Sequence, residues 1–204
     1  MQITKIEFQK KHDDRANLYI DEEFYAGVSV ELVIKEQLKK GMEIEKSRLD
    51  EIILEDQKHT AFSKAIKYSS SVLKTEKQIK EYLKKKEYAP STIDYVIDKM
   101  VEYKYLDDEQ YARAFVLTYS NKYGKLKLIS ALRSKGVSSK IIDNIFSQED
   151  DDLEIKSNIK SVAEKYLKNK VVDAKTYLKL GRFLASRGYE FDEISRVINE
   201  LKGK

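Results

Sequence analysis

The chain of 204 residues has no cysteine and no tryptophan, and it contains one proline and two histidines. The absence of cysteine excludes disulfide bonds and thiolate metal sites. Two histidines are too few for a multi-histidine metal site, so we expect no metal and no other cofactor. No apolar run approaches the length of a membrane span, and no signal-peptide pattern follows Met1. We therefore expect a cytoplasmic protein without membrane contact.

The motifs of common enzyme classes are also missing. The chain has no glycine-rich phosphate loop, no Gly-x-Ser-x-Gly and no His-Glu-x-x-His. Adjacent carboxylates occur at Asp13-Asp14, at Asp107-Asp108 and at 150–152. A turn, a helix N-cap and a linker account for them, and their spacing does not fit a calcium-binding loop. We expect a protein without catalytic activity.

Basic residues, by contrast, are concentrated in the middle of the chain. Residues 61–146 contain 17 Lys and Arg against 10 Asp and Glu, and residues 110–142 contain no acid at all. Without acids, the usual i,i+4 ion pairs of a solvated helix face cannot form inside this block. We therefore predict a contact surface for a partner with dense negative charge. An ordinary lysine-rich surface remains the alternative. The predicted contact residues are Arg113, Lys122, Lys125, Lys127, Arg133 and Lys135.

Tyrosine is the second abundant feature, with 14 residues in the chain, nine of them between positions 61 and 146. Tyr119 and Tyr123 lie beside Lys122, an arrangement that could stack on the bases of a single nucleic-acid strand. The alternative is that these rings cover thin helical layers and leave their hydroxyl groups in water. Both interpretations stay open.

The N-terminal segment has an alternating pattern that differs from the rest. Short apolar alternations in residues 1–28, separated by two polar clusters, predict a three-stranded antiparallel meander. A helix is expected over residues 30–40, ending near Gly41.

From about residue 56 the apolar spacing is helical and repeats. In each repeat an amphipathic helix ends in basic residues and a turn, and the apolar residues after the turn, Tyr88, Val137 and Tyr189, are spaced by 49 and 52 positions. Asp107 is a predicted N-cap, and Gly136 and Gly188 fit left-handed positions that end helices.

The predicted fold is therefore mainly α, with three tandem three-helix repeats in a curved, elongated array. The small β meander and its helices precede this array. The expected boundaries are 1–55 for the N-terminal part and 56–106, 107–148 and 149–204 for the repeats, with a linker at 149–152.

The segment 105–137, YLDDEQYARAFVLTYSNKYGKLKLISALRSKGV, resembles the RecX family, the regulators of the RecA recombinase. The resemblance rests on the Tyr-Leu-Asp-Asp-Glu start, on Gly124 between two helices and on the Lys-Gly-Val ending. The chain departs from the family pattern at Glu87, where a glycine is expected. It also departs in the third repeat, where Ala163 and Tyr166 match the spacing of the earlier repeats less well.

The resemblance implies a regulator that binds RecA and the RecA filament on single-stranded DNA, and that inhibits ATP hydrolysis, strand exchange and filament growth. We expect the chain to be a monomer and to make at most a weak contact with single-stranded DNA. It would act in homologous recombination, DNA repair and the SOS response. One alternative is a non-specific single-stranded DNA-binding protein that blocks RecA by occupying the DNA. Another is a helical scaffold for an unrelated acidic protein.

Overall fold

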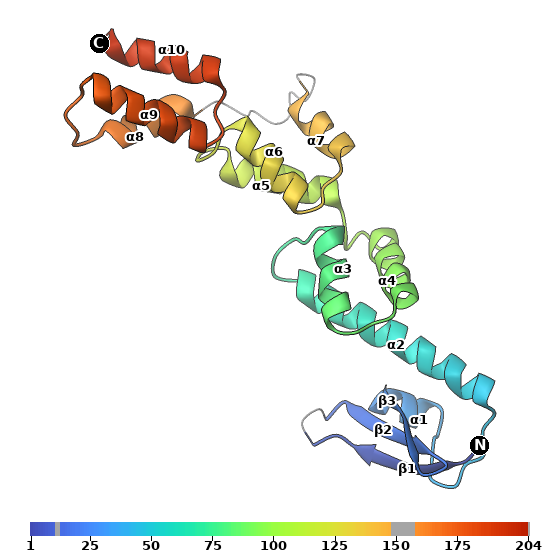
Figure 1. Ribbon diagram of the computed structural model, residues 1–204. Helices are drawn as coiled ribbons and strands as arrows, with labels where there is room; N and C mark the ends of the chain where they lie inside the picture. Colours follow the sequence, from blue (N-terminus) through green and yellow to red (C-terminus); the bar gives the residue numbers. More distant parts are fainter. Residues whose placement is uncertain (11–12, 148–157, 204) are drawn as a thin grey trace. The chain divides into compact units, whose positions relative to one another are not determined.

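The computed structural model describes residues 1–10, 13–147 and 158–203 (Figure 1). Helices dominate, and the one sheet of the described residues is a three-stranded antiparallel sheet at the N-terminus. This confirms the predicted mainly α fold with three three-helix repeats. The predicted linker at 149–152 and the boundary at 148/149 lie outside the described residues.

The N-terminal sheet has the order β1-β2-β3, with β1 at Ile3–Phe8, β2 at Arg15–Ile20 and β3 at Glu23–Ser29. Alternate residues of β2 point into a core that also contains residues of the two following helices, as the strand period of two requires. The first helix, α1 (Val30–Lys35), is shorter than expected. Gln37 takes a positive φ of 51° just after it, so the helix ends before Gly41 is reached.

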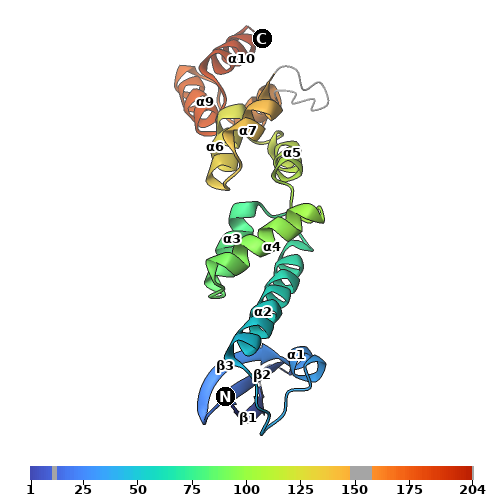
Figure 2. The ribbon, with the colours of Figure 1, turned by 90° about the vertical axis from the view of Figure 1, so that its right-hand side faces the viewer.

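Helix α2 (Lys46–Ser69) joins the sheet to the first repeat. Its first half contributes Leu49 and Ile53 to the core of the sheet, and its second half contributes Ala61 and Ala65 to the core of the first repeat. The expected boundary at 55/56 therefore falls inside one continuous helix, which both ribbon views show (Figures 1 and 2).

Each three-helix repeat has its own hydrophobic core. The first repeat uses the end of α2 with α3 (Glu76–Lys85) and α4 (Pro90–Glu102). The second consists of α5 (Asp108–Tyr119), α6 (Lys125–Ser134) and α7 (Ser139–Phe146). The third consists of α8 (Ile159–Leu167), α9 (Ala174–Ser186) and α10 (Phe191–Lys202).

The same turn follows the second helix of every repeat. Gly136 and Gly188 have φ values of 89° and 85°, which confirms the predicted left-handed positions. Glu87 occupies the corresponding place in the first repeat with φ 62°. The departure from glycine at this position therefore leaves the turn intact, although an L-residue pays a conformational cost there.

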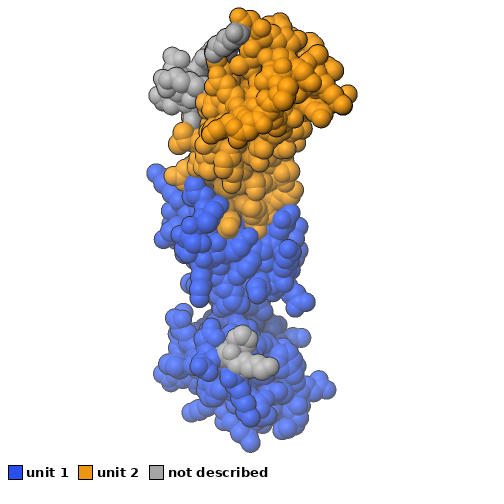
Figure 3. Space-filling view, turned by 90° about the vertical axis from the view of Figure 1, so that its left-hand side faces the viewer, with its two compact units in different colours: residues 1–73, 79–106 blue, residues 74–78, 107–204 orange. Residues whose placement is uncertain are grey.

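The chain divides into two compact units (Figure 3). The first contains Met1–Leu73 and Ile79–Leu106, and the second contains Lys74–Gln78 and Asp107–Lys204. The cap and first turn of α3 thus belong with the second and third repeats. The curvature of the array stays a prediction.

None of the helices within residues 1–10, 13–147 and 158–203 combines the length and the apolar character needed to cross a membrane.

Candidate functional site

Two of the predicted contact residues, Lys125 and Lys127, lie at an end-to-end contact between helices of the second unit. The N–H of Gly124, the N-cap of α6, donates to the carbonyl of Arg187, the C-cap of α9, at 2.9 Å. The N–H of Leu126 donates to Gly188 O at 3.1 Å. The start of α6 therefore meets the end of α9, and we call this contact the α9–α6 junction.

A second junction has the same design one repeat earlier. The hydroxyl of Thr75, a fully buried residue just before α3, donates to the carbonyl of Lys135, the C-cap of α6, at 2.7 Å. Lys77 Nζ donates to Ser134 O at 3.0 Å, and Lys127 Nζ donates to Ser186 O at 3.1 Å in the α9–α6 junction. Ser134 and Ser186 are 52 positions apart, like Val137 and Tyr189, so the two serines occupy corresponding places in successive repeats.

Both junctions satisfy backbone groups that a helix leaves unpaired at its ends. They also place the partly negative carboxyl end of one helix against the partly positive amino end of another. Close approach depends on glycine: a Cβ at Gly124 would lie 2.6 Å from Tyr189 N, and a Cβ at Gly136 would lie 2.5 Å from Lys77 Cβ. Within the second unit, the segment Lys74–Gln78 thus meets the end of α6, and the start of α6 meets the end of α9.

The junction changes the interpretation of Lys127. Its ammonium group is bonded to Ser186 O and lies 5.3 Å from the ring centre of Tyr123, so it has a structural partner as well as an exposed position. Lys135 is half-buried, with Nζ 5.8 Å from the Phe115 ring centre, and Lys125 Nζ lies 6.0 Å from that of Phe146.

The expectation that the basic block has no acid partner is wrong for Arg113. Its Nε and Nη2 donate to Glu109 Oε1 at 3.1 and 2.9 Å, an i,i+4 ion pair with a residue just outside the acid-free segment. The remaining five predicted contact residues form no ion pair with a carboxylate of the described residues. Of these five, Lys122 and Arg133 are exposed and have no ring partner in the described part of the chain.

Two cations of the third repeat, which the sequence analysis does not predict as contact residues, also lie at aromatic rings. Arg187 Cζ lies 5.4 Å from the Tyr123 ring centre, and Lys170 Nζ lies 3.1 Å from that of Tyr166. Neither cation has an ion-pair partner among the described residues. The 52-residue spacing from Lys135 to Arg187 was the sequence signal that could have identified Arg187.

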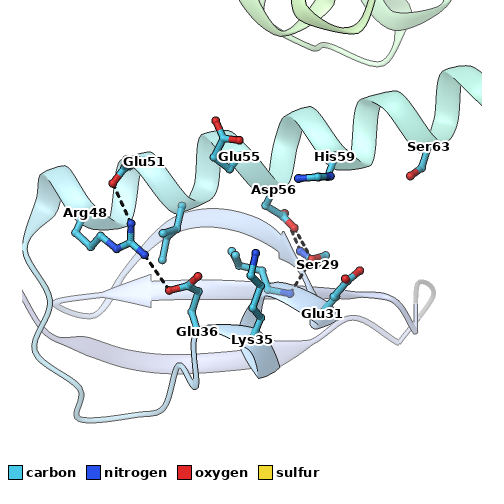
Figure 4. Close-up of a pocket in the computed structure, with 12 residues that line it drawn as sticks. Ser29, Glu31, Lys35, Glu36, Arg48, Glu51, Glu55, Asp56, His59 and Ser63 are labelled. Atoms are coloured by element: carbon cyan, nitrogen blue, oxygen red, sulfur yellow. Dashed lines mark hydrogen bonds and ion pairs between the residues drawn. The ribbon is translucent and has the colours of Figure 1, made fainter. Parts of the chain in front are cut away.

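A separate groove of about 390 Å³ lies in the first unit between α1 and α2 (Figure 4). Its lining has five carboxylates against the two cations Lys35 and Arg48, and Arg48 pairs with Glu51 at 3.0 Å and with Glu36 at 3.3 Å. The hydrogen bond to Glu51 is the main reason that the pKa of Arg48 is raised. No bond joins His59 in this groove to a serine or a carboxylate of the described residues, so no nucleophile–base pair is assembled there.

The buried carboxylate of this groove, Asp56, has a structural role. It accepts hydrogen bonds from the Ser29 N–H at 3.0 Å and from the Ser29 hydroxyl, while Ser29 Oγ accepts the Leu32 N–H at 3.0 Å and caps α1. Asp56 thereby ties α2 to the start of α1. Within the described residues, no group of three His, Asp or Glu side chains could hold a metal ion.

Four family models match consecutive parts of the chain. "Regulatory protein RecX N-terminal domain" matches residues 1–45, and the first, second and third "three-helix domain" of RecX match residues 61–100, 107–144 and 154–198. The chain belongs to the RecX family. This confirms the resemblance seen at residues 105–137, and the third three-helix domain is matched even though its alanine and tyrosine spacing departs from the earlier repeats.

Full-length relatives agree with the RecX assignment. "Regulatory protein RecX" of Clostridium tetani (strain Massachusetts / E88) is 38% identical over 203 residues, which cover 98% of this chain and 94% of that protein. The protein of the same name from Bacillus subtilis (strain 168) is 32% identical over 207 residues, covering 98% and 77%.

Two solved RecX structures share the fold. "Crystal structure of regulatory protein RecX" has a TM-score of 0.66 and 25% identity, and the match covers 98% of both chains. "Crystal structure of RecX from Lactobacillus salivarius" has a TM-score of 0.63 and 23% identity, covering 73% of this chain and 99% of that one, and it supports the fold alone.

Proposed function

We propose that the chain regulates the RecA recombinase by binding RecA and the filament that RecA forms on single-stranded DNA. Binding inhibits ATP hydrolysis, strand exchange and filament growth, and the chain itself catalyses no reaction. It acts in the cytoplasm as a monomer and needs no cofactor. In this proposal the RecA filament contacts the six basic residues Arg113, Lys122, Lys125, Lys127, Arg133 and Lys135.

The observation that carries the proposal is the set of unpaired cations on the second repeat of a RecX-family chain. Five of the six residues have no carboxylate partner among the described residues, whereas an ordinary helix surface pairs opposite charges. Carboxylates of a protein partner or phosphates of its DNA would supply the missing negative charge. Such complementarity favours rapid encounter and a defined orientation.

Charge reversal tests the contact surface. In the variant Lys125→Glu/Arg133→Glu, both exposed side chains repel an acidic partner, while the backbone of both junctions is untouched. We expect the concentration needed for half-inhibition to rise by about tenfold, equivalent to about 1.4 kcal/mol. The measurement is ATP hydrolysis by preassembled RecA filaments on single-stranded DNA, with the chain well below one per RecA.

The matched control is Lys175→Glu/Arg182→Glu, which makes the same charge change at exposed positions of α9. Unchanged inhibition by a folded Lys125→Glu/Arg133→Glu variant would reject the contact assignment, and so would an equal loss in the control. Inhibition that appears only when the chain saturates the DNA would identify a competing DNA-binding protein. No inhibition by the unmodified chain at any ratio would reject the proposed function.

A further inference from the structure

Aromatic rings form one group in the second repeat and another in the third, and a single arginine lies between the two groups. In α5, Phe115 and Tyr119 have ring centres 4.6 Å apart, and Tyr123, in the turn after α5, follows at 6.2 Å. In the third repeat, the rings of Phe183 and Tyr166 stack at 4.6 Å. Arg187 bridges the two groups, 5.4 Å from the Tyr123 ring centre and 5.0 Å from that of Phe183. We call these five rings the aromatic row.

Cations accompany the row along its length. Lys135 lies at Phe115, Lys127 and Arg187 lie at Tyr123, and Lys170 lies at Tyr166. No ion pair joins these four cations to a carboxylate among the described residues. A ring face attracts a cation but does not neutralise it. The row therefore presents fixed, uncompensated positive charge.

Tyr119 differs from the other rings of the row. It is 37% exposed, and within the described residues no cation covers its face. Its neighbours on either side, Phe115 and Tyr123, both carry cations. An open ring between two positive groups has the arrangement that a nucleotide requires: a surface for the base and charges for the adjoining phosphates.

We propose that the aromatic row and its cations form a binding site for single-stranded nucleic acid, with a base stacked on Tyr119 and phosphates at Lys127, Lys135, Arg187 and Lys170. The α9–α6 junction creates this site, because its hydrogen bonds bring Arg187 from the third repeat against Tyr123 of the second. The site binds without RecA, so it goes beyond the regulation proposed above.

A single strand fits the row better than a duplex does. A duplex keeps its bases stacked on each other, so only its phosphates could reach the cations and Tyr119 would have no role. Because Tyr119 offers a ring face that any base can stack on and the cations bind phosphates, we expect little dependence on base sequence.

The charge part of the proposal is tested by fluorescence anisotropy with a labelled oligothymidylate of about 20 nucleotides, long enough for a site of this kind. The probe is titrated with the full chain at several salt concentrations in the absence of RecA. Lys170→Gln/Arg187→Gln keeps the backbone of the junction and removes two phosphate contacts. On a single strand each phosphate contact contributes about 0.7 to the slope of log Kobs against log salt concentration. We therefore expect the loss of two contacts to make this slope shallower by about 1.4.

The control Lys175→Gln/Arg182→Gln removes the same charge from exposed positions of α9 outside the row, and it should keep the slope of the parent. An equal change in this control would overturn the site, because binding would then follow overall charge. Absence of oligonucleotide binding by the parent chain at about 50 mM salt, where phosphate contacts are strong, would also overturn it.

The stacking part is tested with Tyr119→Leu, which keeps an apolar side chain but removes the aromatic face. We expect at least about fivefold weaker oligothymidylate binding, with Tyr105→Leu, a 53% exposed tyrosine of the first unit, as the unchanged control. Unaltered affinity of Tyr119→Leu, or equal affinity for a duplex of the same length, would overturn the single-strand assignment. If the Lys170→Gln/Arg187→Gln variant lost RecA inhibition but kept oligonucleotide binding, the row would be a protein contact instead.

Discussion

Glu87 occupies a backbone conformation that its side chain does not favour. Its φ of 62° lies in the left-handed region, where a Cβ crowds the following carbonyl group. The corresponding residues of the other two repeats are Gly136 and Gly188. The first repeat therefore tolerates at Glu87 a strain that the other two avoid.

Replacing Glu87 with glycine should relieve this strain. We expect Glu87→Gly to raise the free energy of unfolding by about 0.5–1 kcal/mol, after the entropy that glycine gains in the unfolded chain is subtracted. Urea denaturation followed by circular dichroism measures the change. Glu87→Ala removes the same side chain but keeps the Cβ and should give no such gain; equal stabilisation by both variants would mean that the side chain, not the backbone, is responsible.

Asp108 is a half-buried carboxylate at the start of α5, and its Oδ1 accepts the Glu76 N–H at 2.9 Å. Burial raises the pKa of Asp108 above its usual 3.8, and this outweighs the hydrogen bond from Glu76, which lowers it. A raised pKa means that the folded state holds the proton more tightly than the unfolded state does. The resulting stabilisation is complete below the unfolded pKa and is lost as the pH rises through the folded pKa.

Asp108→Asn should therefore stabilise the chain at neutral pH, because the neutral amide avoids the desolvation cost while its oxygen still accepts the Glu76 N–H. The advantage should shrink as the pH falls through the raised pKa of folded Asp108, and it should be gone below the ordinary aspartate pKa of 3.8, where both states hold the proton. Denaturation at pH 7 and pH 3 compares the two proteins. A constant difference at both pH values would contradict the assignment of the effect to Asp108 ionisation.

At the scale of elements, the α9–α6 junction depends on the absence of a side chain at Gly124. A Cβ there would lie 2.5 Å from the carbonyl carbon of Gly188, a backbone atom that cannot rotate away. The φ of Gly124 is −79°, which suits any residue, so the close approach alone requires glycine.

Gly124→Ala should open the junction and lower the free energy of unfolding by roughly 1–3 kcal/mol. The Leu126 amide, which donates to Gly188 O, should exchange with solvent faster. Gly181→Ala is the control: its Cβ would meet Ile198 Cδ1 at an ordinary 3.6 Å, and alanine suits the interior of α9 better than glycine. Unchanged exchange at Leu126 in Gly124→Ala would show that the junction does not need close contact.

Local features of these elements could be predicted from the sequence because their causes are local. Asp107 does accept the N–H groups of Glu109 and Gln110, as its capping position predicts. The junctions, and with them the contacts of Lys127 with Ser186 and of Arg187 with Tyr123, join residues more than fifty positions apart, and the spacing of apolar residues does not reveal which distant residues meet. The ion pair of Arg113 with Glu109 was missed because only residues inside the acid-free segment were considered as partners, and Glu109 immediately precedes that segment.

At the scale of the whole chain, the repeat pattern was predictable because each repeat buries its own apolar stripe. The cores of the three repeats contain different residues at similar spacing, including Ala61, Ala112 and Ala163, all fully buried. The continuity of α2 was harder to predict from the sequence, because its first half packs in the core of the sheet and its second half in the core of the first repeat. A change of buried partner along one helix resembles a domain boundary in the sequence.

The start of α9 is capped by a side chain of its own first turn, whereas the start of α6 is bonded to another helix. Asp173 is the N-cap of α9, as Gly124 is of α6, and its Oδ1 accepts the Thr176 N–H of its own helix at 2.7 Å. The Thr176 hydroxyl donates a hydrogen bond to Val171 O at 2.9 Å. Asp173 therefore caps the start of α9 from within its own first turn, whereas the amides at the start of α6 find their acceptors, Arg187 O and Gly188 O, in another repeat. A cap of this kind is compatible with a junction, because Thr75 accepts the Gln78 N–H at the start of α3 and still donates its hydroxyl to Lys135 O.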